Sequence, residues 1–301
     1  MFYVLKWINH PVDFIFCLLF GALISPTDPI AVLGILTKSN VLKKLEIDIV
    51  GESLFNDGIG IVLFISILEI IRTNSGFHMS DFLILLFREA GGGILFGWAL
   101  GYVMYLLMKS IDDYQTEVII TLAGVMGGYF LANQLHISGP LAMVVAGLFT
   151  GSRSKDLAMS ETTELYVDKF WELIDVLMNA ILFVLIGLQL ITLEYNKNFF
   201  IIGLLAIPII LCSRYLAIRV PQLLLRKWIN LDRKAIFLMT WGGLRGGLSI
   251  AMALSLKYAE QKDMFVFVTY IVVLFSIMVQ GLSMGKLARS FYPTKPAEAK
   301  D

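Results

Sequence analysis

Long apolar runs separated by short polar stretches recur along the whole chain. Nine runs are apolar over most of their length, at about residues 12–37, 47–71, 82–108, 118–133, 139–150, 170–193, 199–225, 235–256 and 264–287. A transmembrane helix needs about 20 apolar residues, whereas the strands of a membrane β-barrel are short and alternate apolar with polar positions. These runs do not alternate. The pattern predicts an all-α polytopic membrane protein with about nine transmembrane segments, forming a single transmembrane domain over residues 1–301.

Two of the nine predicted segments are interrupted near their middle. The first contains Ser25-Pro26-Thr27-Asp28-Pro29, in which two prolines remove two backbone donors and disfavour helix just before each of them. The eighth contains Gly242-Gly243-Leu244-Arg245-Gly246-Gly247. We therefore expect two broken helices, each made of half-helices that meet near the membrane centre.

The distribution of basic residues predicts the orientation of the chain. The loops after segments one, three, five, seven and nine hold fifteen Lys and Arg residues, and the opposite side holds six. Because cytoplasmic loops carry the positive excess, we expect a cytoplasmic C-terminus with residues 292–301 as a short tail. The two broken segments then run in opposite directions, which is typical of inverted repeats around a midplane site in secondary transporters.

Composition agrees with a membrane protein and limits the class of partner. Hydrophobic residues make up 57% of the chain and charged residues 16%, whereas soluble domains have about 45–50% and about 25%. The apolar composition leads us to expect the lipid bilayer as a partner. The charges of the 24 basic and 24 acidic residues cancel, so we expect no nucleic-acid partner. Cys17 and Cys212 lie inside apolar runs and are expected to be core residues.

The run Gly51-Glu52-Ser53-Leu54-Phe55-Asn56-Asp57-Gly58 places two carboxylates and an amide inside an otherwise apolar segment. Ionisable residues inside a membrane are costly and usually functional. On a helix Ser53 and Asp57 are four residues apart and share a face, as do Glu52 and Asn56. This run is therefore the first candidate for an ion-binding site.

The position of each polar residue along its segment estimates its depth in the membrane. Asp57, Asp28 and Arg245 each lie near the middle of a segment, so we expect them close to one plane. The face with Ser53 and Asp57 is expected to point towards Thr27 and Asp28. Carboxylate, hydroxyl and unwound carbonyl oxygens suit a hard cation, and no His or Cys cluster has transition-metal spacing. The sequence thus favours Na⁺, Li⁺, K⁺ or H⁺ as the substrate.

We interpret Glu52 differently from Asp57. A buried glutamate needs a partner, because an uncompensated buried charge is strongly destabilising. Arg214 of the seventh segment matches the depth of Glu52, and Arg245 is the second candidate. We expect Glu52 to belong to a structural ion pair. For Arg245 two roles stay open: compensation of carbonyl groups freed at the broken helix, and repulsion of cations.

Three motifs follow one another along the chain, at residues 25–32, 51–58 and 242–249, and residues 139–148 and 170–172 with Asn179 accompany them. Together they resemble the sodium/hydrogen exchanger, NhaP-type, family of monovalent cation:proton antiporters. The resemblance covers essentially the whole chain. It implies a homodimer whose broken helices form a core that moves against a dimer domain.

The resemblance also implies how the segments divide. Residues 12–71 and 199–287 correspond to the core ion-binding helices, and residues 82–193 to the dimer or scaffold helices. Subunits of the family contain further helices before the first broken one, so we expect this chain to lack the N-terminal helices.

The activity implied by the resemblance is electroneutral Na⁺/H⁺ antiport in the cell (plasma or inner) membrane, serving pH and sodium homeostasis, without a cofactor and without enzymatic chemistry. Cation and proton compete for Asp57 under alternating access. Asp57, Ser53 and Thr27 are the expected Na⁺ ligands, with Asp28, Asn56 and Glu52 as further site residues. The ion pair of the family maps onto Glu52 and Arg214, and Arg245 supports the helix break.

Three alternatives accompany this interpretation. The first is a K⁺/H⁺ antiporter, because cation selectivity depends on the size of the site. The second is a truncated remnant that does not transport. The third is an intramembrane aspartyl protease that uses Asp28 and Asp57, although neither residue lies in a Gly-X-Gly-Asp motif.

Overall fold

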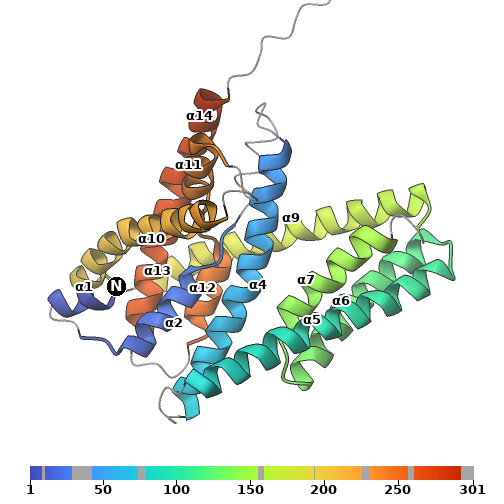
Figure 1. The fold of residues 1–301 in the computed structure, drawn as a ribbon, viewed down its shortest axis with the longest axis horizontal. Coiled ribbons are helices and arrows are strands. Elements are labelled where there is room, and N and C mark those ends of the chain that lie inside the picture. The colour runs from blue at the N-terminus through green and yellow to red at the C-terminus, as the bar shows by residue number, and fades with distance from the viewer. Residues whose placement is uncertain are drawn as a thin grey trace, which may run out of the picture. The chain divides into compact units, whose positions relative to one another are not determined.

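The computed structural model describes residues 1–8, 11–28, 43–73, 79–154, 159–192, 194–225, 231–256 and 261–292. Every regular element in these ranges is a helix (Figure 1). The helices are α1 (Phe2–Trp7), α2 (Phe14–Ile24), α4 (Lys43–Thr73), α5 (Met79–Lys109), α6 (Tyr114–Gln134), α7 (Gly139–Phe149), η1 (Thr150–Ser154), α9 (Glu161–Thr192), α10 (Lys197–Leu224), α11 (Arg233–Trp241), α12 (Gly247–Leu254), α13 (Lys262–Phe275), η2 (Ser276–Gly281) and α14 (Leu282–Phe291). The predicted all-α class is confirmed over these ranges.

Six described helices are long and apolar enough to cross a membrane. They are α4, α5, α6, α9, α10 and the continuous run from α13 through η2 to α14. The helix α2 and the run from Gly139 to Ser152 are apolar but shorter. The predicted number of nine transmembrane segments therefore stays a prediction.

The eighth predicted segment is two helices in the structure. Helix α11 ends at Trp241 and α12 begins at Gly247, and the residues between them are not helical. In the first segment, α2 ends at Ile24 and residues 25–28 are not helical. The expected second half of that segment lies outside the described residues.

Side-chain caps explain where several helices begin. Asp232 accepts a hydrogen bond from the Ala235 amide at the start of α11 (2.7 Å), and Ser138 accepts one from the Leu141 amide at the start of α7 (3.3 Å). A short polar side chain at this position satisfies one of the four amides that a helix leaves unpaired at its N-terminus. Helix α7 also has a proline in its first turn, where the missing amide is not needed.

The chain divides into two compact units, residues 1–57 with 188–301 and residues 58–187. In the second unit α5 packs along α7, and both pack on α6. Glycines permit this approach: a Cβ atom on Gly97 would overlap the Ala142 carbonyl oxygen, and one on Gly101 would lie 2.8 Å from the Phe149 Cβ atom. The glycine-rich third segment is thus a close helix-packing surface.

In the first unit, α13 packs against α10 and α12, and α11 packs against α10 and α14. Leu238, Leu244, Met284 and Ala288 belong to a buried apolar cluster between these helices. The transition from α13 to α14 is a π-helical turn, η2, which the apolar pattern does not predict. The expected division into core and scaffold helices stays a prediction.

Candidate ion-binding site

The non-helical residues after α2 meet α4 at Asp57. The Thr27 amide donates a hydrogen bond to Asp57 Oδ1 (2.8 Å), and the hydroxyl groups of Thr27 and Ser53 are 3.0 Å apart. The Ser53 hydroxyl also donates to the Thr27 carbonyl oxygen. Thr27 and Ser53 are buried and Asp57 is partly exposed. The three expected Na⁺ ligands therefore lie together.

This contact gathers four oxygen-bearing groups of three kinds in one place. They are the Asp57 carboxylate, the two hydroxyl groups of Ser53 and Thr27, and the Thr27 carbonyl oxygen. Such oxygen donors suit hard cations. Within the described ranges no group of three or more His, Cys, Asp or Glu side chains is arranged to hold a metal ion.

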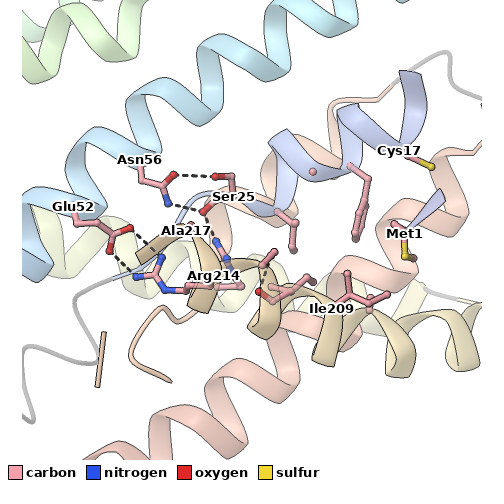
Figure 2. A pocket seen from close by; sticks show the side chains of 15 residues that line it. Met1, Cys17, Ser25, Glu52, Asn56, Ile209, Arg214 and Ala217 are labelled. Atoms are coloured by element: carbon pink, nitrogen blue, oxygen red, sulfur yellow. Dashed lines mark hydrogen bonds and ion pairs between the residues drawn. The ribbon is translucent and has the colours of Figure 1, made fainter. Parts of the chain in front are cut away.

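Asn56 joins α4 to the end of α2 through two reciprocal hydrogen bonds. Its amide nitrogen donates to the Ser25 carbonyl oxygen (2.7 Å), and the Ser25 hydroxyl donates to Asn56 Oδ1 (2.9 Å). Figure 2 shows both bonds. Asn56 thus fixes the backbone just before Thr27. Ser25 has no role among the predicted site residues, although a serine at a proline-broken helix end often bonds to nearby polar groups.

Glu52 and Arg214 form a bidentate ion pair (Figure 2). Arg214 Nη1 is 3.0 Å from Glu52 Oε1 and Nη2 is 2.6 Å from Oε2, while Nε donates to the Met239 carbonyl oxygen (3.1 Å). The Arg214 side chain is 7% exposed and that of Glu52 30%. Paired bonds of this kind are strong and geometrically specific. A Cβ atom on Gly243 would overlap the Arg214 guanidinium, so the second break needs a glycine here.

Arg245 connects the two breaks. Its side chain is buried, and Nη1 donates to the carbonyl oxygens of Ser25 and Pro26, the latter at 3.0 Å. The Asp28 amide donates to the Leu244 carbonyl oxygen (2.8 Å). Arg245 therefore compensates freed carbonyl groups, one of the two roles left open by its sequence position, but these groups belong to the first broken segment.

The Asp28 side chain lies beside the start of α12. A Cβ atom on Gly246, the residue that precedes α12, would lie 2.8 Å from the Asp28 Cβ atom and 3.0 Å from Oδ2. The first amides of a helix lack partners inside the helix and favour a nearby negative charge. The expected role of Asp28 beside the cation ligands stays a prediction, and its place beside α12 is not evident from the sequence.

A cavity of about 380 Å³ lies next to these polar residues. Its polar lining includes Glu52, Asn56, Arg214 and Arg245, and most of the rest comes from apolar residues of α2 and α10, with Met1 at one side. Figure 2 shows the Glu52–Arg214 and Asn56–Ser25 contacts at one side and Met1 and Cys17 at the other. The cavity gives the ion pair and Asn56 a partly open side, whereas Ser53 and Thr27 are buried.

Known proteins share the sequence and the fold that carry this site. A family model described as "sodium/hydrogen exchanger, transmembrane" matches residues 2–289. The Na⁺/H⁺ antiporter NhaP of Pseudomonas aeruginosa is 48% identical, with a match covering 100% of this chain and 72% of that protein. The Na⁺/H⁺ antiporter NhaH of Halobacillus aidingensis is 40% identical over 88% of this chain and 66% of its own length.

A solved structure shares the fold. The sodium proton antiporter MjNhaP1 of Methanocaldococcus jannaschii superimposes with a TM-score of 0.79, covering 97% of this chain and 75% of that one, at 23% sequence identity. That identity supports the likeness of fold alone. The family model covers nearly the whole chain, and the P. aeruginosa relative is similar throughout it. On these grounds the chain belongs to the sodium/hydrogen exchanger family.

Proposed function

We propose that this chain is an electroneutral Na⁺/H⁺ antiporter in which cation and proton compete for Asp57. The observation that carries the proposal is the meeting of Asp57 with Thr27 and Ser53, which brings a carboxylate, two hydroxyl groups and a carbonyl oxygen together. Similar proteins are named Na⁺/H⁺ antiporters, and the family is one of transporters.

The chemistry of the site explains why binding is exclusive. A Na⁺ ion needs the negative Asp57 carboxylate together with the oxygen lone pairs of Ser53 and Thr27. A proton on Asp57 removes that charge and occupies a carboxylate oxygen. Each ligand therefore binds only after the other has left, and alternating access to the two membrane sides turns this competition into exchange.

Residues around Asp57 position it without binding the ion. In this proposal the Glu52–Arg214 pair holds α4 to α10, the Asn56–Ser25 pair holds α4 to α2, and Arg245 supports the unwound carbonyls. The Asp28 carboxylate is proposed to interact with the unpaired amides at the start of α12, beside which its side chain lies. No cofactor is required, because the carboxylate supplies the proton-binding group.

The arrangement of the whole protein is also part of the proposal. The unit formed by residues 1–57 and 188–301 contains the site and is proposed as the transport core, and residues 58–187 as the scaffold that pairs two subunits. The basic loops favour a cytoplasmic C-terminus in the cell membrane. Pairing and location are testable by crosslinking in membranes and by labelling the tail from either side.

Cation-driven proton flux in vesicles tests the proposal. The purified chain is reconstituted into liposomes with an internal pH dye, and pulses of Na⁺, Li⁺ or K⁺ are applied with the membrane potential clamped first to zero and then to a non-zero value. We expect a Na⁺-driven pH change that does not depend on the potential and that Asp57→Asn abolishes. The matched control is Glu69→Gln, since Glu69 lies on the same helix with a half-exposed side chain.

Each outcome separates the alternatives. Normal exchange by Asp57→Asn would refute the assigned site. A response to K⁺ instead of Na⁺ would favour a K⁺/H⁺ antiporter. No response to any of the three cations by a folded wild-type chain would favour a remnant that does not transport. The protease alternative has lost its support, because the chain belongs to a transporter family.

A further inference from the structure

We propose that Ser276 and Gln280, both in the π-helical turn η2, are positioning residues that hold the second helix break and Arg245 in register with the ion site. The consequence for transport rests on the function proposed above. The contact itself does not rest on that function, so the contact and its consequence for transport have separate tests.

The evidence is a chain of buried hydrogen bonds between η2 and both ends of the break. The Arg245 amide donates to Ser276 Oγ (2.9 Å), and the Ser276 hydroxyl donates to Gln280 Oε1 (2.6 Å). The Gln280 amide nitrogen then donates to the Trp241 carbonyl oxygen (2.8 Å). Trp241 ends α11, and Arg245 lies two residues before α12. One turn of α13–α14 therefore satisfies an acceptor before the break and a donor within it.

Burial makes these bonds matter. Ser276 is 0% exposed and Gln280 3%, and a buried polar group without a partner is destabilising. Interrupting a helix frees backbone groups that water cannot reach in a membrane. Without these two side chains, the Arg245 amide and the Trp241 carbonyl oxygen would lose the partners described here. Ser276 and Gln280 thus supply the hydrogen-bond partners that two backbone groups at the helix break need.

A π-helical turn is the element that carries the pair. Such turns are rare, occur as local bulges in α-helices and are often found at functional sites. A second contact fixes the same turn: the Trp241 indole nitrogen donates to Ser283 Oγ (2.8 Å), and the Ser283 hydroxyl donates to the Val279 carbonyl oxygen (2.5 Å). The end of α11 is therefore attached to this region through both its backbone and its last side chain.

The same break reaches the ion site on its other side. Arg245 Nη1 donates to the Pro26 carbonyl oxygen (3.0 Å), and the Leu244 carbonyl oxygen accepts from the Asp28 amide (2.8 Å). Thr27 lies between Pro26 and Asp28 in the sequence, and its amide donates a hydrogen bond to Asp57. A shift of the break relative to η2 would therefore be transmitted to the oxygen donors around Asp57. This continuity makes Ser276 and Gln280 positioning residues for cation binding.

Hydrogen exchange measured by mass spectrometry tests the contact without requiring transport. In Ser276→Ala the peptide spanning residues 242–247 should exchange about fivefold faster, as expected for loss of one hydrogen bond to the Arg245 amide. Ser276→Thr keeps the hydroxyl group and should restore slow exchange. The control is Met278→Ala, since Met278 lies in the same turn but is 62% exposed. Unchanged exchange in Ser276→Ala would overturn the proposal.

Transport kinetics in the vesicle assay test the consequence. Per folded protein, Ser276→Ala and the near-isosteric Gln280→Met should raise the half-saturating Na⁺ concentration about fivefold, with a smaller change in maximal rate. A merely structural role would lower the yield of folded protein and leave half-saturation unchanged. Faster exchange at residues 242–247 with unchanged half-saturation would therefore overturn the proposed link to the ion site.

The contact and its consequence for transport can fail independently. A wild-type chain that exchanges no cation would refute the proposed function, while the hydrogen-exchange result would still decide the contact. If Ser276→Ala does not fold, Gln280→Met provides the same two readouts: it removes the donor to the Trp241 carbonyl oxygen and the acceptor of the Ser276 hydroxyl, which then no longer holds that hydroxyl towards the Arg245 amide.

Discussion

The Glu52–Arg214 ion pair makes a prediction about stability that a double-mutant cycle can test. Glu52→Leu leaves the buried Arg214 guanidinium with the Met239 carbonyl oxygen as its one acceptor among the described residues. Arg214→Leu instead leaves a carboxylate on a side chain that is 30% exposed. Because only the first change strands a charge away from water, we expect Glu52→Leu to be the more destabilising single substitution.

The expected magnitudes follow from burial. Removing one member of a buried pair costs about 3–5 kcal/mol of stability. Because Glu52 is partly exposed, we expect the loss for Glu52→Leu at the lower end, about 3 kcal/mol. Arg214→Leu should cost about 1–2 kcal/mol, because the remaining carboxylate is partly hydrated and the Met239 carbonyl loses a donor. The double variant strands no charge and should also lose only about 1–2 kcal/mol. It should therefore be more stable than Glu52→Leu alone.

Thermal unfolding of the purified protein in detergent, followed by tryptophan fluorescence, measures this order. About 3 kcal/mol corresponds to a midpoint lower by about 5 °C for a chain of 301 residues, and the second substitution should recover much of it. The matched control is the Lys169–Glu172 pair, which is equally short at 2.6 Å but has side chains 67% and 64% exposed. Its double-mutant cycle should show no resolvable coupling.

Additive losses would refute this reasoning. A double variant whose midpoint falls by the sum of the two single changes would mean that Glu52 and Arg214 contribute independently. A Glu52→Leu protein as stable as the wild type would mean that the guanidinium finds another partner or water.

Three further predictions use the same purified protein. Gly97→Ala should lower the unfolding midpoint, because a Cβ atom there overlaps a backbone carbonyl oxygen of α7. The control is Gly91→Ala on the same helix, whose Cβ atom meets nothing within 4 Å and which should raise the free energy of unfolding by up to about 1 kcal/mol. Equal shifts in the two variants would contradict this packing. In the pH range where Asp57 is protonated, each unit fall in pH should raise the half-saturating Na⁺ concentration about tenfold, and a flat profile in vesicles would exclude competition at one carboxylate. Asn56→Leu removes both hydrogen bonds to Ser25 and should speed hydrogen exchange of the peptide containing residues 25–28; unchanged exchange would show that α2 is held elsewhere.

Much of the helical arrangement follows from apolar patterning and glycine or proline placement. The third predicted segment, at about residues 82–108, is α5 from Met79 to Lys109, and the glycine run at residues 242–247 coincides with the end of α11 and the start of α12. Helix α9 begins at Glu161 instead of about residue 170, because its first turns are polar and an apolar run cannot mark them. The short helix α1 has too few residues to stand out.

Contacts within the site were predictable where charge demanded a partner or where helical spacing placed polar side chains on one face, as for Ser53 and Asp57. Glu52 and Arg214 match in depth, and opposite charges in a membrane have few other partners, so spacing along the segments made Arg214 the first candidate and Arg245 the second; the bidentate contact decides between them. Neutral groups that bond to the backbone give no such constraint. Ser276 and Gln280 lie in an apolar run, and their acceptor and donor at Trp241 and Arg245 are backbone atoms that sequence does not distinguish. Backbone geometry at a break decides these contacts.

The group of charges around the two breaks has a consequence for what can cross the membrane. Three carboxylates, of Asp28, Glu52 and Asp57, lie with two guanidinium groups, of Arg214 and Arg245. With Asp57 ionised, their formal charges sum to −1. Either a sodium ion or a proton brings the sum to zero, so both loaded forms are equally neutral. Only the empty form would carry a net charge through a low-dielectric barrier, which is costly. The balance of five side chains would then suppress the return of an empty carrier.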